Sequence, residues 1–285
     1  MTCPRCQAAI IPGDRFCAEC GGRIAAPDPP GEGGSALAMG PGLAAHTDPG
    51  VRHRINQDAF ALSGPAEGGA GSILVVCDGV SQSQTPELAA ATAARVAHAA
   101  LAQGVPMADA IRQAHEAVCA LPFDRQAALD PPATTIVAAT LDAASATLGW
   151  LGDSRAYRLG AESALLTRDH SWWMDAVSHG MTEAEASRDP RAHALLHCLG
   201  ATDFARASPC PEPAVSVVPA GPGWLTLCSD GLWNYAPTAA ALTREAGGDV
   251  DGDAAGLCAR LIAFARMAGG HDNITVAAAR WPARA

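Results

Sequence analysis

The sequence predicts an α+β domain, in which helices and sheets form separate layers, preceded by a small metal-binding module. Three observations support this prediction. Two Cys-x-x-Cys pairs stand within the first 20 residues. From about residue 46 to 282, short apolar runs typical of strands alternate with segments of helical pattern. Two or three helices follow the first strands and further strands come next, an order that fits layered α+β packing better than a regular βαβ repeat.

The size and composition of the chain narrow the classes of function. The chain has 285 residues, of which 49% are hydrophobic and 17% charged, and its formal net charge is −10. An acidic chain without a basic block is a poor candidate for binding nucleic acid or a membrane surface. No apolar run approaches the ~20 residues of a membrane span, and the N-terminus lacks a signal-peptide pattern. We therefore expect a cytoplasmic protein with one sizeable core, and a monomer.

The first 24 residues carry four cysteines with the spacing of zinc ligands. They are Cys3, Cys6, Cys17 and Cys20. Each pair forms a turn in which two thiolates converge, and four thiolates complete tetrahedral zinc. A segment this short cannot build its own core, so the metal would supply its folding energy. We predict a zinc ribbon over 1–24 with a structural or protein-docking role; a redox dithiol pair is the alternative.

Residues 25–45 are rich in Pro, Gly and Ala without a hydrophobic period, which predicts a flexible linker before the domain at 46–282. The remaining cysteines are scattered singly, mostly in apolar runs. They are Cys77, Cys119, Cys198, Cys210, Cys228 and Cys258. This pattern indicates small buried hydrophobic residues rather than a disulfide framework or catalytic thiols.

The elements of the main domain are predicted in order from local patterns. Strand candidates, rich in apolar and β-branched residues, are 72–77, 134–140, 147–151, 155–159, 214–218, 224–228 and 274–278. Helix candidates are 86–102, 107–120 and 254–267. Thr85 is a candidate N-cap of the first helix, with Pro86 at its first position. Ser171 is expected to cap a short helix, and Thr182 with Glu185 has the form of a capping box.

Five aspartates share one setting, at or next to a strand end and beside Gly, Ser or Asn. They are Asp58, Asp78, Asp153, Asp230 and Asp272. Any one of them could be only a turn former. Together they predict carboxylates that converge on one rim of the sheets, where a hard divalent cation would relieve their repulsion. An all-oxygen donor set favours Mg or Mn over zinc.

These aspartates belong to motifs that recur in a known order. The motifs are HTDPG at 46–50 with NQD at 56–58, DG at 78–79, TT at 134–135, GDSR at 152–155, LT and DHS within 166–171, SDGL at 229–232 and DNITV at 272–276. In this order they resemble the metal-dependent protein phosphatase 2C (PPM-type) family and its bacterial Ser/Thr phosphatases. The resemblance covers about 46–282 and implies a four-layer α-β-β-α sandwich with a two-metal centre at one edge.

The resemblance also assigns roles to residues. It implies that Asp78 bridges two Mn or Mg ions, that Asp230 and Asp272 complete the first, and that the Gly79 carbonyl binds the second. Asp58 would hold a metal-bound water, and Asp153 with Asp230 matches a weaker third metal site. Asn56 and Asn273 are expected to support this centre, Asn273 through Asp272.

The implied activity is hydrolysis of phosphoserine and phosphothreonine by a hydroxide that bridges the metals. The expected partners are phosphorylated Ser/Thr proteins, including substrates of cytoplasmic Ser/Thr kinases. The alternative is a phosphatase-fold binding or scaffold module with weak or no catalysis. Because Asp78, Asp230 and Asp272 are all present, the enzyme is favoured.

Several positions depart from the family pattern. His53 stands where the family often has an Arg that clamps the phosphate, so His53 is either a substitute clamp or a structural residue. Val80 stands where some relatives have a candidate general acid, and Gln57 where many have Glu. The segment 166–199 corresponds to the family's variable flap. Its Trp172 and Trp173 are expected to pack, with substrate contact as the alternative, and His193 and His197, spaced one helical turn apart, are expected to be structural.

Overall fold

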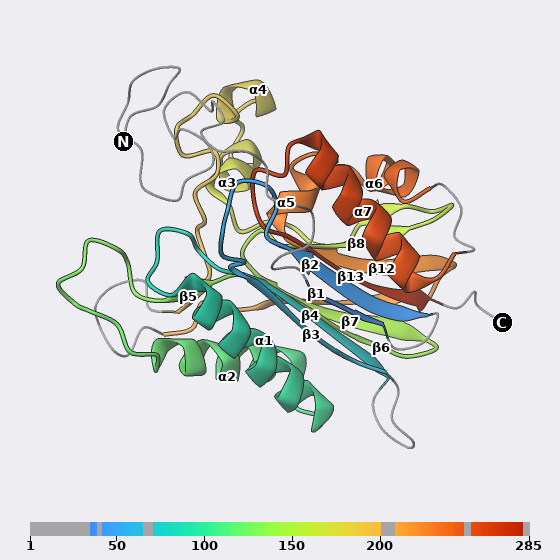
Figure 1. Ribbon diagram of the computed structural model, residues 1–285, viewed down its shortest axis with the longest axis horizontal. Helices are drawn as coiled ribbons and strands as arrows, with labels where there is room; N and C mark the ends of the chain where they lie inside the picture. Colours follow the sequence, from blue (N-terminus) through green and yellow to red (C-terminus); the bar gives the residue numbers. More distant parts are fainter. Residues whose placement is uncertain (1–34, 39–41, 65–70, 201–208, 248–251, 282–285) are drawn as a thin grey trace.

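The computed structural model describes residues 35–38, 42–64, 71–200, 209–247 and 252–281, and in them two antiparallel sheets pack face to face (Figure 1). The six-stranded sheet has the order β1 (Ser35–Ala38), β2 (Leu43–Asp48), β13 (Ile274–Trp281), β12 (Gly223–Cys228), β8 (Arg155–Leu159), β9 (Ala164–Leu165). The five-stranded sheet has the order β11 (Ala214–Pro219), β7 (Ser145–Leu151), β6 (Ile136–Leu141), β4 (Ser72–Asp78), β3 (Asp58–Ser63). The short strands β5 (Ala133–Thr134) and β10 (Leu199–Gly200) form a separate pair.

Helices cover the outer face of each sheet. The five-stranded sheet is covered by α1 (Pro86–Ala102) and α2 (Met107–Cys119), and the six-stranded sheet by α7 (Ala254–Ala268), α6 (Ala239–Glu245) and α5 (Asp230–Trp233) (Figure 1). Three buried apolar clusters fill the spaces between the layers, one between the sheets and one under each helical layer. The order helix, sheet, sheet, helix agrees with the predicted α+β sandwich.

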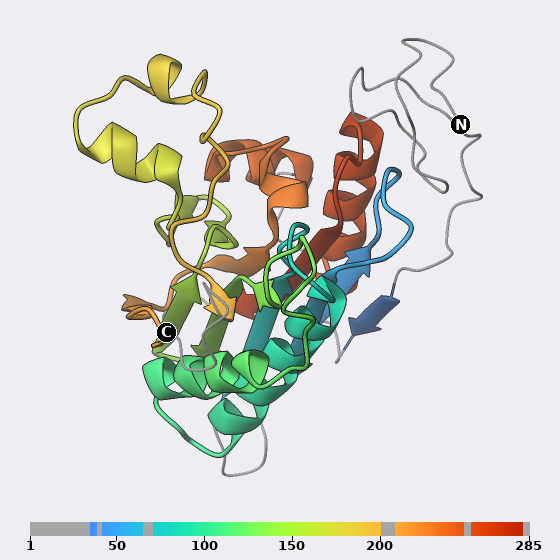
Figure 2. The same ribbon diagram turned by 90° about the vertical axis from the view of Figure 1, so that its left-hand side faces the viewer.

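The flap is an excursion from the six-stranded sheet. It contains α3 (Trp172–Ser178) and α4 (Glu183–Ala186), which project beyond one end of the sandwich (Figure 2). Its return segment lies against its start, because Trp172 N donates to Ala194 O and Leu196 N donates to His170 O. No helix in the described part of the chain is long and apolar enough to cross a membrane.

Most of the predicted elements are confirmed, with informative exceptions. The segment 134–140 divides into β5 and β6, and the strands β2 and β3 were missed. Ser171 caps α3 through its side chain, and Thr182 with Glu185 forms the capping box. The side chain of Thr85 does not cap α1; its backbone has φ 48°, a conformation that is uncommon for a β-branched residue.

The segment predicted as a linker, 25–45, contains β1 and the start of β2. Leu43, Ala44 and Ala45 are buried, because β13 pairs with β2 along its length. The sequence of β2 carries no local strand signal, because its small residues lie in a Pro- and Gly-rich context. Pairing with β13, far away in the sequence, stabilises β2 as a strand.

Candidate metal centre

The predicted acidic residues lie at one end of the two sheets. Asp58 begins β3 and is the register partner of Asp78, the last residue of β4. Asp230 starts α5 directly after β12, and Asp272 precedes β13, the strand that pairs with β12. In Figure 1, α5 and the loop between β2 and β3 lie at this same end. The topology therefore brings together carboxylates that are far apart in sequence.

Hydroxyl groups of Ser229 and Thr135 fix the positions of Asp58 and Asp78. Ser229 Oγ donates to Asp58 Oδ2 at 2.7 Å, and Thr275 N donates to Ser229 Oγ at 2.9 Å. Asp78 N donates to Thr135 Oγ1 at 3.2 Å, and Thr135 in turn shares a 2.7 Å hydrogen bond with Ser154. Ser229 and Thr275 were not predicted as site residues, although they lie within the SDGL and DNITV motifs.

The electrostatics of this rim are unfavourable without a counter-ion. Burial raises the pKa of Asp78 well above its usual value, and the negative charges of Asp58 and Asp230 raise it further. Burial likewise raises the pKa of Asp230, with Asp153 and Asp272 adding to the effect. For Asp58, burial raises the pKa to about 7 despite its hydrogen bonds with Thr275 and Ser229.

The donor set fits a hard divalent cation. Asp58 Oδ1 is buried and has no hydrogen-bond partner among the described residues. All the candidate ligands are oxygen atoms, which suits Mg or Mn rather than zinc. Within the described residues, no three His, Cys, Asp or Glu side chains already enclose a common metal position. Mg is usually held by one or two carboxylates and retains several waters, so the arrangement of Asp78 and Asp230 is compatible with it.

Gly79 is fixed by its surroundings. A Cβ atom at Gly79 would lie 2.5 Å from Pro86 O and 2.7 Å from Gln57 O, so a larger residue would displace the backbone. Gly79 N donates to Gln57 O at 3.1 Å. The close approach of α1 and the β2–β3 loop thus requires glycine at the predicted carbonyl ligand.

Asp272 lies at the exposed edge of the centre, with 43% of its side chain accessible. His53 Nε2 lies 3.6 Å from Asp272 Oδ1, so the loop presents His53 to the acidic centre. Asn273 N donates to Asp272 Oδ1 at 2.8 Å. Arg52 and Arg54 on either side of His53 are exposed.

The side chain of Asn273 holds the loop between β2 and β3. Its Oδ1 accepts from Gln57 N at 2.7 Å, and its Nδ2 donates to Pro49 O at 2.9 Å and Ile55 O at 3.2 Å. Asn273 was predicted to support Asp272; its backbone does so, whereas its amide positions the loop that carries His53.

Asn56 links the same loop to Asp58. Asn56 Nδ2 donates to Thr47 Oγ1 at 2.8 Å, and its Oδ1 accepts from Asp58 N at 3.2 Å. Gln57, one of the departures from the family pattern, contacts the loop that follows Gly79, because Ser81 Oγ donates to Gln57 Oε1 at 2.8 Å. The altered loop after Gly79 is therefore matched to the altered residue at 57.

Asp153 lies on the flap side of the centre. Its backbone carbonyl accepts from Trp233 Nε1 at 2.9 Å. Burial raises the pKa of Asp153 to about 7, with the charge of Asp169 as the next cause. Behind it, Arg155 and Asp169 form a buried ion pair with a 2.7 Å contact between Nη2 and Oδ2.

The structure changes the interpretation of the flap residues. His193 and His197 lie outside any helix, so they are not one helical turn apart. His197 instead packs edge-to-face on His170, with 5.4 Å between the ring centroids. Trp172 and Trp173, which were expected to pack, are both half-buried, so part of each ring is accessible to solvent.

The predicted zinc ligands Cys3, Cys6, Cys17 and Cys20 lie outside the described residues. Of the scattered cysteines, Cys77, Cys228 and Cys258 are buried as predicted, and Cys119, Cys198 and Cys210 are half-buried. Burial raises the pKa of all of them, which disfavours the nucleophilic thiolate.

No known family profile matches the sequence, and no curated protein sequence does. Solved structures do match. Ser/Thr phosphatase Stp1 from Staphylococcus aureus has a TM-score of 0.70 and 20% identity, over 92% of this chain and 99% of that chain. The PPM Ser-Thr phosphatase MsPP from Mycobacterium smegmatis, in complex with cacodylate, has a TM-score of 0.68 and 28% identity, over 87% and 98%.

A third matching structure contains manganese. The catalytic domain of the Ser/Thr protein phosphatase PstP, in complex with two manganese ions, has a TM-score of 0.64 and 26% identity, over 84% of this chain and 96% of that chain. The two antiparallel sheets flanked by helices are therefore the fold of the metal-dependent PPM Ser/Thr protein phosphatases.

Proposed function

We propose that this protein is a metal-dependent phosphatase that hydrolyses phosphoserine and phosphothreonine in proteins. One observation carries the proposal: the buried Asp58 and the half-buried Asp78 and Asp230 repel one another at one rim, in a fold shared with a phosphatase that binds two manganese ions. Such an arrangement destabilises a metal-free protein, and a function in cation binding accounts for its presence.

The candidate ligands are Asp78, the Gly79 carbonyl, Asp230, Asp272 and, for a weaker third site, Asp153. Two bound Mn or Mg ions would activate a water and neutralise the phosphoryl oxygens of the substrate. Zinc bound by the N-terminal cysteines would give that segment a structural or a protein-docking role.

The chain's own residues bind and orient the reactants. Asp58 Oδ1, which has no partner among the described residues, is available to accept a hydrogen bond from the attacking water, while Ser229 fixes the other oxygen of this carboxylate. His53, held by its loop beside Asp272, replaces the family's Arg as a donor to the substrate phosphate. Asn273 is a positioning residue, since it holds the loop that carries His53.

The test is hydrolysis of a phosphothreonine peptide by metal-stripped protein, with Mn, Mg or Zn added back in turn. We expect Mn or Mg to restore activity in the wild type and not in Asp230→Asn. Asp109→Asn, which changes an exposed aspartate on α2, is the matched control and should remain active. A folded wild-type protein that is inactive with every metal would refute the phosphatase and favour a phosphopeptide-binding module.

A further inference from the structure

A recess of about 200 Å³ lies between the flap and the six-stranded sheet. Arg155 of β8, Asp153 just before it and Trp233 of α5 line one side, and the flap contributes Asp169, Trp173 and His193 among other residues. This volume is below the ~300–1,000 Å³ of typical small-molecule sites, so the recess is too small for a drug-sized ligand. Asp153 joins the recess to the metal centre, because its charge acts on Asp230.

The cation in the recess, Arg155, already uses most of its hydrogen-bond donors. Arg155 Nε and Nη2 donate to the two Asp169 oxygens, and Arg155 Nη1 donates to Tyr157 Oη and Pro237 O. The guanidinium also covers the Trp233 ring, with Cζ 3.7 Å from the centroid. Four of the five N–H groups of Arg155 are therefore used, one Nη2 hydrogen has no partner among the described residues, and the charge of Arg155 is balanced by Asp169.

While the weaker third metal site proposed at Asp153 is empty, the remaining charge in the recess is negative. No described side chain donates to the Asp153 carboxylate, and Arg155 with Asp169 is neutral as a pair. The other wall is the indole of Trp173, whose Nε1 is occupied by Ser187 Oγ at 3.0 Å. A carboxylate and an aromatic ring that line the same recess are both groups that attract a cation.

Five of the six tryptophans have a cation or an aromatic ring against the indole ring in the described part of the chain. Trp172, Trp224, Trp233 and Trp281 each have an arginine over the ring. Trp150 stacks on His170. Among the described residues, Trp173 has neither a cation nor an aromatic ring against it.

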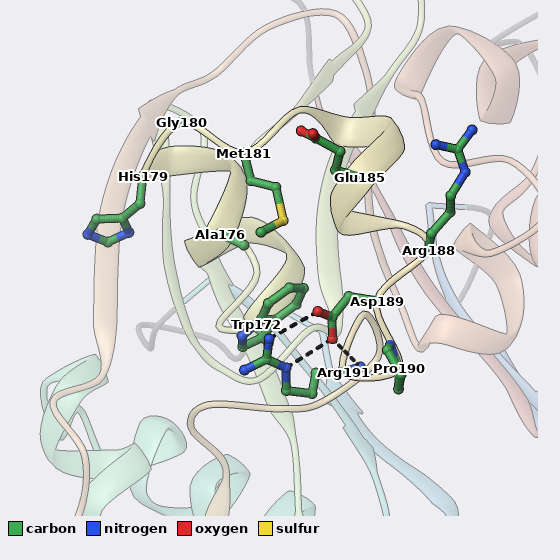
Figure 3. Close-up of a pocket in the computed structure, with 10 residues that line it drawn as sticks. All are labelled: Trp172, Ala176, His179, Gly180, Met181, Glu185, Arg188, Asp189, Pro190 and Arg191. Carbon is green, nitrogen blue, oxygen red and sulfur yellow. Dashed lines mark hydrogen bonds and ion pairs between the residues drawn. The ribbon is translucent and has the colours of Figure 1, made fainter.

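At the neighbouring Trp172 of α3, the chain itself supplies a ring, a carboxylate and a guanidinium together. Figure 3 shows Arg191 beside Trp172, paired with Asp189. The distance from Arg191 Cζ to the Trp172 centroid is 4.3 Å. In the recess, Trp173 and Asp153 provide a ring and a carboxylate, and the Arg155 guanidinium lies over Trp233 instead of Trp173.

We infer that this recess binds an arginine or lysine side chain of the phosphoprotein substrate, near the phosphorylated residue. The inference rests on the proposed function and adds a substrate preference to it. Trp173 is the specificity-determining residue, and it lies outside the predicted metal ligands.

The test uses phosphothreonine peptides that carry one Arg at successive positions on either side, with an all-Ala reference. We expect one Arg position to raise kcat/KM about tenfold, an effect of the size of a partly desolvated cation–π contact. Trp173→Ala should remove this preference, and Trp172→Ala, whose side chain lines a different pocket, should keep it. Hydrolysis of p-nitrophenyl phosphate, which has no flanking residues, should be unchanged in both variants.

Equal kcat/KM for every peptide in the wild type, or a preference that survives in Trp173→Ala, would overturn the inference. Calorimetric binding of the same peptides to the wild type and Trp173→Ala separates the two proposals. An Arg preference in binding without hydrolysis of p-nitrophenyl phosphate would refute the phosphatase and retain the recess as a binding site.

Discussion

Asp78 is a half-buried carboxylate whose pKa is raised by desolvation and by the negative charges of four other aspartates. Removing this charge has opposite consequences for stability and for activity. The carboxylate is needed to hold a cation, yet without the cation it repels its neighbours. These two effects can be measured separately, because Asn has nearly the same shape as Asp.

We predict that Asp78→Asn lowers phosphatase activity at least about 100-fold and raises the melting temperature of the metal-free protein. Relief of roughly 1 kcal/mol of repulsion corresponds to about 2–4 °C for a domain of this size. Calorimetry of the metal-stripped variant beside Asp109→Asn is the measurement. A lower melting temperature for Asp78→Asn would show that repulsion does not dominate at this residue.

The side-chain amide of Asn273 fixes the loop between β2 and β3. Asn273 is 2% exposed, and its side chain makes three hydrogen bonds to backbone atoms of the β2–β3 loop. We predict that Asn273→Ala destabilises the protein by about 2–4 kcal/mol, because buried backbone groups lose their partners. Chemical denaturation measures this, with Asn234→Ala at an exposed amide as the control. Equal stability of the two variants would contradict the positioning role.

At the scale of elements, the base of the flap depends on a neutral histidine. Gly152 N donates to His170 Nδ1 at 3.4 Å, and the ring stacks on Trp150. Burial lowers the pKa of His170, with the nearby His197 and Arg168 acting in the same direction and Asp169 against it. Protonation of Nδ1 would remove the acceptor for Gly152.

The pH dependence follows from this lowered pKa. An unfolded histidine titrates near pH ~6.5, so the contribution of His170 is fully present above that pH and is lost as pH falls through the lower folded value. We predict that the drop in melting temperature between pH 7 and 5 is smaller in His170→Asn, whose amide oxygen can accept from Gly152 N without titrating. An identical drop in both proteins would exclude His170 as a source of acid lability.

The elements also show what the sequence could predict. The strand β4, an apolar run followed by Asp-Gly, is visible locally, as are the capped helices α3 and α7. The strand β2, with the sequence LAAHTD, has no local signal because β13 determines its conformation. The meeting of aspartates at strand ends was predictable. The roles of Ser229, the Asn273 amide and Trp173 depend on contacts between segments far apart in the chain.

At the scale of the whole molecule, stability depends on the layer between the two sheets. Leu148 of β7 is fully buried there with Leu225 of β12 and Ala277 of β13. We predict that Leu148→Ala lowers the free energy of unfolding by about 2–5 kcal/mol, since the cavity is enclosed by both sheets. Val217→Ala on the edge strand, where the side chain is 65% exposed, should change it by less than about 0.5 kcal/mol. Denaturant titration of both variants measures the free energy of unfolding. An equal decrease in Leu148→Ala and Val217→Ala would contradict the packing of Leu148 between the two sheets.

The central claim is that the carboxylates at the strand ends form a divalent-cation centre. Calorimetric titration of the metal-stripped protein with Mn, for the wild type and Asp78→Asn, tests it most directly. The account predicts binding of about two Mn equivalents by the wild type, as expected for a two-metal phosphatase centre, and loss of at least one in the variant. Absence of Mn binding by the folded wild type, or equal binding by Asp78→Asn, would contradict it.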